Sequence, residues 1–447
     1  MSPAGDRSGA PAGARQPQDH VIESVTCLGC GCSCDDIRVQ VRDGRIARAG
    51  NACALGEAWF GDGRVPARTR VVDRDVSIGD AIDAVAAVLA HAKAPLIYLA
   101  PDVSCETQRE AVALADILHA SLDTVTTSTA LASIVAAQER GRAGATLGEV
   151  RNRADVLLFW GVDPHARYPR YLSRYAPEPQ GVHVGGRGAR TVIAVDIGER
   201  PGPADADVRV DVPADEEVDT LLALEAIVRN PATPIAGALW TRARDIAERL
   251  TPAKYAVIVA DAEAGDTGAH STRGSQLARA SALIAVAQSL NDQTRCGLST
   301  LRAGGNRAGA DSVLTSQTGY PAAVSFIHGF PTYRPFDAPT PDAVLVIGAA
   351  NLIPDAVTQA WGEAARLVVG PRASEHGAAH VAIDTGIAGI HHAGTALRMD
   401  DVPLRLRQVI DGPANPLDML RRLMRVTKSG AAEGPPLPMR TAQESTR

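Results

Sequence analysis

The chain has 447 residues, a hydrophobic fraction of 45% and a formal net charge of −6. This length exceeds that of a typical single domain, so we expect two or three domains that share a large buried core. The acidic balance and the lack of a basic block argue against nucleic acid or an anionic membrane as a partner. The first residues lack the apolar run of a secretory signal, and no apolar stretch approaches the length of a membrane helix. We therefore predict a cytoplasmic protein.

Gly, Pro and Ala dominate the two ends of the sequence. We predict a disordered tail over residues 1–19 and, over 412–447, a helix followed by a second disordered tail. Between them we expect a small cysteine-bearing module over 20–62 and a large region of interleaved α/β domains over 63–411. Most of the seven cysteines lie in the small module, which indicates metal ligands in a reducing compartment rather than disulfides.

Four cysteines near the start of the chain are the strongest sign of chemistry. They are spaced C-x2-C-x3-C, with a fourth after 18 further residues: Cys27, Cys30, Cys34 and Cys53. The segment before the fourth predicts a β-hairpin with its turn at Asp43-Gly44, which folds that cysteine back onto the others. Such a set of thiolates suits a 4Fe–4S cluster, a tetrahedral zinc ion or a vacant cysteine pocket. The spacing assigns no role to Cys32.

Beyond residue 75, short apolar strands alternate with amphipathic helices. Ser77 with Asp80 forms a capping-box-like start for the first helix. We predict strands over 95–100, 124–129, 155–161, 191–197, 255–262, 343–349 and 366–371, and helices over 82–92, 105–120, 216–229, 275–290 and 355–365. Continuous apolar strands between such helices indicate parallel sheets covered on both faces. The predicted fold class is α/β, with doubly wound parallel-sheet domains and a small N-terminal cysteine-rich β module.

Two of the predicted strands end in similar loops. One strand ends with Gly161 and is followed by Asp163, and another ends around Gly348 and is followed by Asn351. In open α/β sheets, ligands bind beyond the carboxyl ends of the strands, where a small residue lets them approach the backbone. Both loops therefore fit a nucleotide-binding role, although neither contains a known phosphate-binding fingerprint. The alternative is a tight strand-to-helix turn.

Several long segments together identify a family resemblance. They are TCLGCGCSCDD with NACALG, TLGEVRNRADVLLFWGVDPHARYPRY, LRAGGN with TSQTGYPAAVSF, and GIAGIHHAGTALRMDDVPLRLR. In this order they resemble the B subunit of formylmethanofuran dehydrogenase, in the molybdopterin oxidoreductase superfamily, over residues 22–411. The resemblance implies a 4Fe–4S cluster on the four cysteines. It also implies a molybdenum or tungsten atom, held by two pterin guanine dinucleotides, that reduces carbon dioxide to formate for a partner subunit.

The resemblance fails at the metal ligand. Family members carry a Cys-His pair upstream of a stretch that corresponds here to Gln138, Gly141 and residues 146–149. Counting back without gaps places Thr129 at the cysteine position and Ala130 at the histidine position. A hydroxyl is far harder to deprotonate than a thiol and is a harder ligand. We therefore predict that no catalytic residue of the redox site is intact.

A nearby segment keeps only part of the family pattern. Arg302 matches an arginine that family members place near the metal, whereas Gly304 stands where they carry a histidine and Gly305 replaces a bulkier residue. We interpret the two glycines as a pocket that has lost its acid–base groups. The alternative is a flexible glycine loop that still binds a pterin backbone.

Other polar residues are weaker candidates. The resemblance places His391 and Arg398 at the end of the fold that holds the dinucleotides, and Arg167 and Arg170 are similar candidates for phosphate contact. His376 and His380 have the spacing of a helical zinc site, but the sequence between them disfavours a helix. The acidic run over 215–217 predicts a helix N-terminus.

The resemblance and its failure together lead to a functional prediction. Bacteria that oxidise formaldehyde through tetrahydromethanopterin have a related formyltransferase/hydrolase complex, which moves the formyl group from the pterin onto a methanofuran-like carrier and hydrolyses it to formate without a net redox step. We predict that this chain is the B subunit of such a complex, structural and redox-inactive, with a 4Fe–4S cluster and with the chemistry in partner subunits. The alternatives are an active molybdopterin or tungstopterin subunit that interconverts carbon dioxide and formate, and a free-standing zinc-stabilised binding module.

Overall fold

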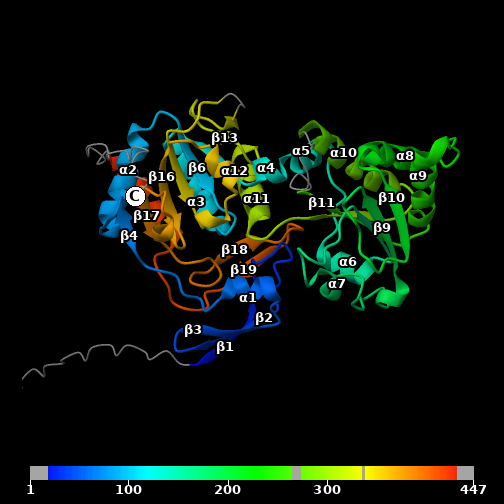
Figure 1. Cartoon of the computed structure of the whole chain (residues 1–447), viewed down its shortest axis with the longest axis horizontal. Helices are drawn as coiled ribbons and strands as arrows, with labels where there is room; N and C mark the ends of the chain where they lie inside the picture. Colours follow the sequence, from blue (N-terminus) through cyan, green and yellow to red (C-terminus); the bar gives the residue numbers. More distant parts are fainter. Residues whose placement is uncertain (1–18, 264–272, 335–337, 430–447) are drawn as a thin grey trace, which may run out of the picture.

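The structure is a computed structural model that describes residues 19–263, 273–334 and 338–429. The predicted tails lie almost entirely outside these ranges. Two lobes lie side by side, and a small β-sheet with the N-terminal strand lies below them (Figure 1). Among the described residues, no helix is both long and apolar enough to cross a lipid bilayer.

A nine-stranded sheet forms the first lobe. Its five central strands are parallel, and two antiparallel strands flank them at each edge. The order is β14 (Thr332–Tyr333), β13 (Val324–Ser325), β7 (Ser121–Thr124), β6 (Pro95–Leu99), β15 (Ala343–Ile347), β16 (Ala365–Gly370), β17 (Val381–Asp384), β4 (Thr69–Val71) and β5 (Arg74–Asp75). The helices α2 (Ile78–His91), α3 (Cys105–Ile117), α11 (Arg307–Thr318) and α13 (Pro416–Ser429) share one apolar core with this sheet. The region around α12 (Asp355–Gln359) covers the other face.

A five-stranded, fully parallel sheet forms the second lobe. Its order is β10 (Val208–Val212), β9 (Thr191–Ile197), β8 (Val156–Trp160), β11 (Ala256–Asp261) and β12 (Cys296–Leu301). Helices α8 (Glu217–Arg229), α9 (Gly237–Leu250) and α10 (Arg273–Leu290) cover one face. Helices α6 (Leu147–Arg153) and α7 (Tyr171–Arg174) lie on the other face, together with the cysteine loop. In sequence, this lobe lies between the strands that form the two halves of the nine-stranded sheet. The two sheets, with parallel strands and helices on both faces, confirm the predicted α/β fold with parallel sheets.

Two smaller β units lie beneath the lobes (Figure 1). β1 (His20–Val25), β2 (Ile37–Arg42) and β3 (Arg45–Gly50) form an antiparallel sheet, and α1 (Ala54–Phe60) follows it. Asp43 and Gly44 both have positive φ values, 48° and 69°, as the predicted hairpin turn requires. β18 (Gly394–Leu397) and β19 (Pro403–Leu406) form a separate hairpin.

Most predicted elements are present within a few residues. The predicted helix start is confirmed, because the Ser77 hydroxyl accepts a hydrogen bond from the Asp80 N–H at 3.1 Å. The strand predicted over 124–129 is wrong: β7 ends at Thr124, and the helices α4 (Thr126–Thr129) and α5 (Leu131–Arg140) follow. The threonine-rich run suggested a strand, but the Thr124 hydroxyl accepts a hydrogen bond from the N–H of Thr126 and so supports a helical turn. The predicted helix over 355–365 shortens to α12.

Candidate functional site

The cysteine loop is a buried turn at the base of the second lobe. Cys27, Cys30 and Cys34 are buried, and Cys53 is half-buried at the start of α1. The Cys27 N–H donates to the Cys34 carbonyl at 2.9 Å, which closes the loop. Burial raises the pKa of Cys27 to about 12, and repulsion from the other three thiols adds to the shift. The Cys27 thiol therefore lies within electrostatic range of the other three.

Two arginines, one in α7 and one immediately before it, flank this loop. Arg170 makes a bidentate ion pair with Asp36, at 2.8 and 2.7 Å. Arg174 pairs with Asp35 at 2.5 Å and also with Asp36. Burial raises the pKa of Cys34 to about 11, and both guanidiniums oppose that rise. Positive charge beside the loop favours thiolates over thiols. Arg170, predicted as a phosphate ligand, instead pairs with Asp36.

Thiolates are suitable ligands for a metal cofactor, although the side chains of the four cysteines do not surround a single ion. Across residues 19–263, 273–334 and 338–429, no group of three or more His, Cys, Asp or Glu side chains is arranged to hold one metal ion. The loop approaches its neighbours closely: a Cβ on Gly29 would lie 2.7 Å from the Leu55 carbonyl oxygen, and one on Gly56 would lie 3.2 Å from Cys27 Sγ. The Gly29 N–H donates to Cys27 Sγ at 3.3 Å. The glycines therefore leave the sulfurs a tightly enclosed space.

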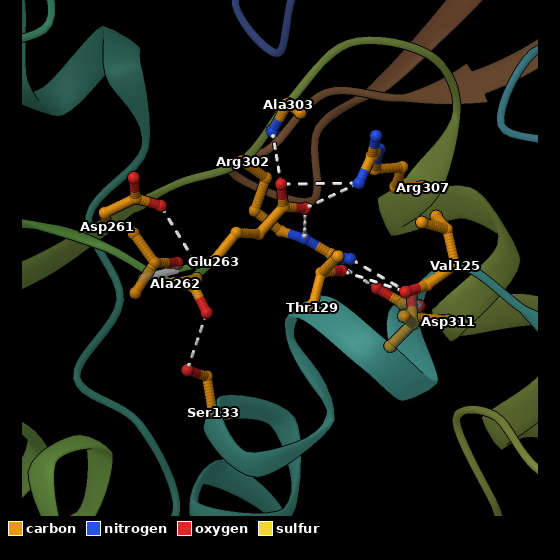
Figure 2. A network of polar contacts seen from close by, with 12 residues as sticks. Val125, Thr129, Ser133, Asp261, Ala262, Glu263, Arg302, Ala303, Arg307 and Asp311 are labelled. Carbon is orange, nitrogen blue, oxygen red and sulfur yellow. Dashed lines mark hydrogen bonds and ion pairs between the residues drawn. The ribbon is translucent and has the colours of Figure 1, made fainter. Parts of the chain in front are cut away.

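Thr129 does not present its hydroxyl to the cavity beside it as a free ligand. The hydroxyl donates to the Val125 carbonyl at 3.0 Å, one helical turn earlier (Figure 2). The next residue, Ala130, lines the cavity and offers only a methyl group. Deprotonation of the threonine would remove this hydrogen bond and create a charge in a buried position. The hydroxyl of Thr129, the residue that we predict at the position of the metal ligand, is therefore engaged in a structural hydrogen bond.

Arg302 lies opposite this turn, at the end of β12, in a network of ion pairs (Figure 2). Its Nε lies 3.3 Å from Glu263 Oε1, its Nη1 pairs with Asp311, and its Nη2 donates to the Thr126 hydroxyl at 3.1 Å. Burial lowers the pKa of this guanidinium, and the charge of Glu263 opposes the shift. Arg307 pairs with the same glutamate. The sequence analysis identified Arg302 but not its partners. Glu263 directly follows the strand predicted over 255–262, and its position there is the one signal that the sequence offered.

A cavity of about 460 Å³ lies beside this network, between the two lobes. Small apolar and hydroxyl side chains line most of it, from α5, α10, α11 and the ends of β11 and β12. The charged groups in its wall are Arg142, Asp261, Arg279, Arg302, Asp311 and Asp401. All of them have partners: Asp261 pairs with Arg167 at 2.5 Å, and Arg142 pairs with Asp401 at 2.5 Å. Arg167, the other predicted phosphate ligand of this region, is thus held by an internal carboxylate.

The predicted strand-end loops lie where the strand order of each sheet reverses. Gly161 follows β8 next to β11, and Gly348 follows β15 next to β6. Ligands bind at such positions in open α/β sheets. Both glycines have positive φ, 56° and 101°, and a Cβ on Gly348 would lie 2.6 Å from Asp102 Oδ1. The cavity beside Gly348 measures about 10 Å³, the size of one water molecule. A nucleotide bound there would require the loops to separate.

The polar side chains of the two strand-end loops form hydrogen bonds within the turns or are exposed to solvent. Asp163 Oδ1 accepts from the His165 N–H at 2.9 Å, and Asn351 is exposed in a short 3₁₀ turn. The Ala349 N–H donates to Asp102 Oδ1 at 2.9 Å. Burial raises the pKa of Asp102, a residue that the sequence did not single out. The tight-turn interpretation therefore accounts for the contacts of both loops.

His391 and Arg398 are likewise engaged within the chain. His391 Nε2 donates to the Gly63 carbonyl at 2.7 Å, while its Nδ1 accepts from the Ile387 N–H at 2.9 Å. Burial lowers its pKa, so the imidazole is neutral near pH 7. Arg398 makes a bidentate pair with Asp400 at 2.6 and 2.7 Å. A phosphate at either side chain would have to replace these contacts.

The remaining sequence candidates have structural roles. His376 and His380 do not share a helix, and His380 Nδ1 accepts from the Arg366 N–H at 3.1 Å. The acidic run at 215–217 starts α8 as predicted, but Glu217 is buried and accepts from the Trp160 indole N–H at 2.9 Å and from Arg279 at 2.6 Å. A buried acid at that position was not evident from the sequence.

Comparison with known proteins finds relatives by sequence and a solved structure with a similar fold. The chain is 31% identical to the B subunit of tungsten-containing formylmethanofuran dehydrogenase 2 from Methanocaldococcus jannaschii, over 91% of this chain and 99% of that protein. It is 28% identical to the protein of the same name from Methanococcus maripaludis, over 88% of this chain and 95% of that one. A chain of the formyltransferase/hydrolase complex from Methylorubrum extorquens, solved with methylofuran, matches with a TM-score of 0.64 and 22% identity, over 81% of this chain and 99% of that one. No protein-family profile matches.

Proposed function

The chain belongs to the family of formylmethanofuran dehydrogenase B subunits, and we propose that it is a redox-inactive B subunit of a formyltransferase/hydrolase-type complex. In this role it would serve formaldehyde oxidation to formate, in one-carbon metabolism linked to tetrahydromethanopterin. Formyl transfer and hydrolysis move no electrons, so a B subunit of such a complex needs no working molybdenum or tungsten centre. The structural match to the Methylorubrum extorquens complex supports the fold that this role requires.

The observation that carries the proposal is the contact of Thr129. Its hydroxyl donates to a backbone carbonyl, and Ala130 beside it carries no proton-transfer group. Arg302 faces the same cavity with its guanidinium paired to two carboxylates. A redox site needs a soft, ionised ligand for the metal and a group that handles protons, and these three positions supply neither.

The glycines near Arg302 have a second explanation that supports a scaffold. A Cβ on Gly304 would lie 2.7 Å from the Gly29 carbonyl oxygen, and one on Gly305 would lie 2.3 Å from that of Pro101. The Gly305 N–H also donates to the Leu28 carbonyl at 2.9 Å. The absence of side chains therefore lets the cysteine loop pack directly on the connection between β12 and α11, and it does not merely enlarge a pocket.

We propose that residues 20–62 hold a 4Fe–4S cluster on Cys27, Cys30, Cys34 and Cys53. A cubane cluster attaches each thiolate to a different iron, so its four cysteines need not converge on one ion. The Cys27 thiol interacts electrostatically with the other three. The neighbouring arginines would stabilise the negative charge of the thiolates. In a redox-silent subunit the cluster would hold the cysteine loop against the two lobes formed by residues 63–411.

We propose the dinucleotide positions, Gly161, Asp163, Gly348, Asn351, His391 and Arg398, only as remnants of a pterin-binding surface. Their polar groups have partners inside the chain, or are exposed, as in Asn351. The partners of this subunit would then supply the transfer and hydrolysis chemistry, on a methanofuran-like carrier. An active molybdopterin or tungstopterin subunit is the competing function, favoured by the retention of the four cysteines.

Metal analysis of the anaerobically purified complex separates these functions. Iron near four per B subunit, without molybdenum or tungsten, is the expected result for a cluster-stapled scaffold. Zinc alone would reassign the cysteine site and leave the scaffold role intact. Stoichiometric molybdenum or tungsten would contradict the proposal, as would formate-dependent reduction of a viologen dye by the wild-type complex.

A further inference from the structure

Three tyrosines from the segment around α7 pack against the cysteine loop. Tyr168, Tyr171 and Tyr175 are spaced three and four residues apart, so they share one face of this helical segment. The chain has only seven tyrosines, and these three gather at one loop. Their rings belong to the same apolar core as four cysteines of the loop: Cys27, Cys30, Cys32 and Cys34.

The hydroxyl of Tyr175 is fully used by the protein itself. It accepts a hydrogen bond from Arg174 Nε at 3.0 Å and donates one to the Cys32 carbonyl at 3.4 Å. This contact joins the end of α7 to the cysteine loop through the backbone. It gives no sign of a bound group.

The hydroxyls of Tyr168 and Ser33 differ from that of Tyr175. Both side chains are 1% exposed, and neither hydroxyl has a hydrogen-bond partner within the part of the chain that the structure describes. Burial raises the pKa of Tyr168, and Cys32, the neighbour of Ser33, contributes to the rise. The Tyr168 hydroxyl is therefore within electrostatic range of the loop. A buried hydroxyl without an acceptor costs about 1–3 kcal/mol, so two beside one loop indicate donors for a group that the loop binds.

We propose that the hydroxyls of Tyr168 and Ser33 donate hydrogen bonds to sulfur atoms of the 4Fe–4S cluster on the cysteine loop and raise its reduction potential. The inference rests on the proposed cluster. Sulfides and thiolates bound to iron carry negative charge and accept hydrogen bonds, whereas a free thiol is a weak acceptor. Donors near the sulfurs of a cluster favour its reduced form, because they stabilise the added negative charge.

Contacts on both sides of the loop hold these two donors in place. Arg170, two residues after Tyr168, makes a bidentate pair with Asp36 of the loop, at 2.8 and 2.7 Å. Ser33 has a positive φ of 39°, and its N–H donates to the Cys30 carbonyl at 3.0 Å. One donor thus comes from the loop itself and the other from a segment that is fixed against it.

The test compares reduction potentials of the anaerobically purified complex containing the wild-type chain, Y168F, S33A or Y98F. Titration monitored by electron paramagnetic resonance gives the potential. Y168F and S33A should each disfavour one-electron reduction about tenfold, which corresponds to a potential lower by about 59 mV. Y98F is the matched control and should equal wild type. The Tyr98 hydroxyl is also buried without a partner among the described residues, but its ring packs on Trp361 in the first lobe.

Thermal unfolding with and without iron is the second measurement. Y168F keeps the aromatic ring and removes only the hydroxyl. With iron bound, it should unfold at a lower temperature than wild type, because a hydrogen bond is lost. After removal of iron with a chelator, it should unfold at the same or a higher temperature, because an unpaired buried hydroxyl is removed. Y98F should shift the unfolding temperature equally in both states.

Three results would overturn the inference. They are an unchanged potential in both Y168F and S33A, an equal shift in Y98F, and an unfolding shift of Y168F that does not depend on iron. The last result would assign the Tyr168 hydroxyl to a buried water molecule. If the potential lies outside the range of the redox mediators, the unfolding comparison decides.

The iron content separates this inference from the proposed cluster. Wild-type complex without iron, or with zinc in its place, would reject both. Iron near four per chain with an unchanged potential and an unfolding shift independent of iron would reject only the two hydrogen bonds.

Discussion

The cysteine loop and the Thr129 turn lie on opposite sides of Arg302 and differ in how their chemical groups are used. In the loop, the Cys27 thiol lies within electrostatic range of the other three, and its Sγ accepts a hydrogen bond from the Gly29 N–H at 3.3 Å. In the turn, the Thr129 hydroxyl is bonded to a carbonyl, and the arginine opposite is paired twice. The loop keeps donors available for a ligand, whereas the turn satisfies its donors internally. The polar groups of the Thr129 turn and of Arg302 therefore have structural roles.

The two regions also touch through their backbones. A Cβ on Gly31 would lie 1.9 Å from the Arg302 carbonyl oxygen, so the loop cannot move independently of the end of β12. A side chain added at Gly31 would therefore disturb both regions at once. Substitutions that change one region and leave this contact intact can separate the two roles.

The largest expected effect is the loss of stability when the buried ion pairs of Arg302 are removed. Arg302→Met leaves Glu263 and Asp311 buried without their shared partner, which should lower the free energy of unfolding by about 3–5 kcal/mol. Chemical denaturation of the full chain measures this loss. The matched control is Arg372→Met, whose pair with Glu375 is exposed and should contribute less than about 1 kcal/mol. Similar losses in both variants would contradict a structural role for the buried network.

The next largest effect concerns metal binding by the cysteine loop. Cys34→Ser should reduce the iron bound per chain by about tenfold or more, because a hydroxyl is a poor ligand for iron in a cluster. The thermal midpoint should fall with the iron content. Cys105→Ser is the control, since Cys105 is also buried but lies outside the loop. Full iron retention in Cys34→Ser would remove this residue from the ligand set.

A smaller effect tests the charges beside the loop. Burial acts to raise the pKa of Asp36, but Arg170 and Arg174 outweigh it and hold that pKa below its usual value. The stabilisation is therefore present above the unfolded-state pKa of about 3.9 and is lost as the pH falls through the lower folded value. Asp36→Asn should cost about 1 kcal/mol at pH 7, since the group is 39% exposed. Urea unfolding of both proteins at neutral and strongly acid pH should show this difference disappear in acid.

The smallest expected effect is zero. Thr129→Cys with Ala130→His would place a Cys-His pair at the two positions that we predict for the metal ligand and its neighbour. Arg302 remains paired in this variant, and Gly304 supplies no acid–base group. We expect no formate-dependent viologen reduction above the wild-type background. Formate-dependent activity in the double variant would show that only the Cys-His pair is missing from a working redox site. It would also show that a metal–pterin cofactor still binds in the pocket.

Much of the fold could be predicted because its signals are local. The hairpin turn at Asp43-Gly44 and the cap at Ser77 depend on residues within a few positions of each other, and both are confirmed. The strand predicted over 124–129 failed because β-branched threonines favour a strand, while their hydroxyls bond to the nearby backbone and support a helical turn.

The candidate site could be predicted only in part, because its contacts are long-range. The cysteine spacing located the loop, and the resemblance located Thr129, Ala130 and Arg302. Nothing in the sequence indicates that Glu263 lies against Arg302 and Arg307, since these residues come from a strand end, a second strand end and a helix start. Pairing of this kind follows from the arrangement of the sheets.

The insertion of one lobe into the other has a consequence for how the chain reaches this structure. The central pair of the nine-stranded sheet joins Pro95–Leu99 to Ala343–Ile347, with the whole five-stranded lobe between them in sequence. During synthesis β6 therefore cannot pair with β15 until the five-stranded lobe has been made. The five-stranded lobe itself can fold from contiguous residues. Until β15 emerges from the ribosome, one edge of β6 stays unpaired and open to pairing with other chains. We therefore expect the interval before β15 is made to be the stage at which this protein depends most on chaperones.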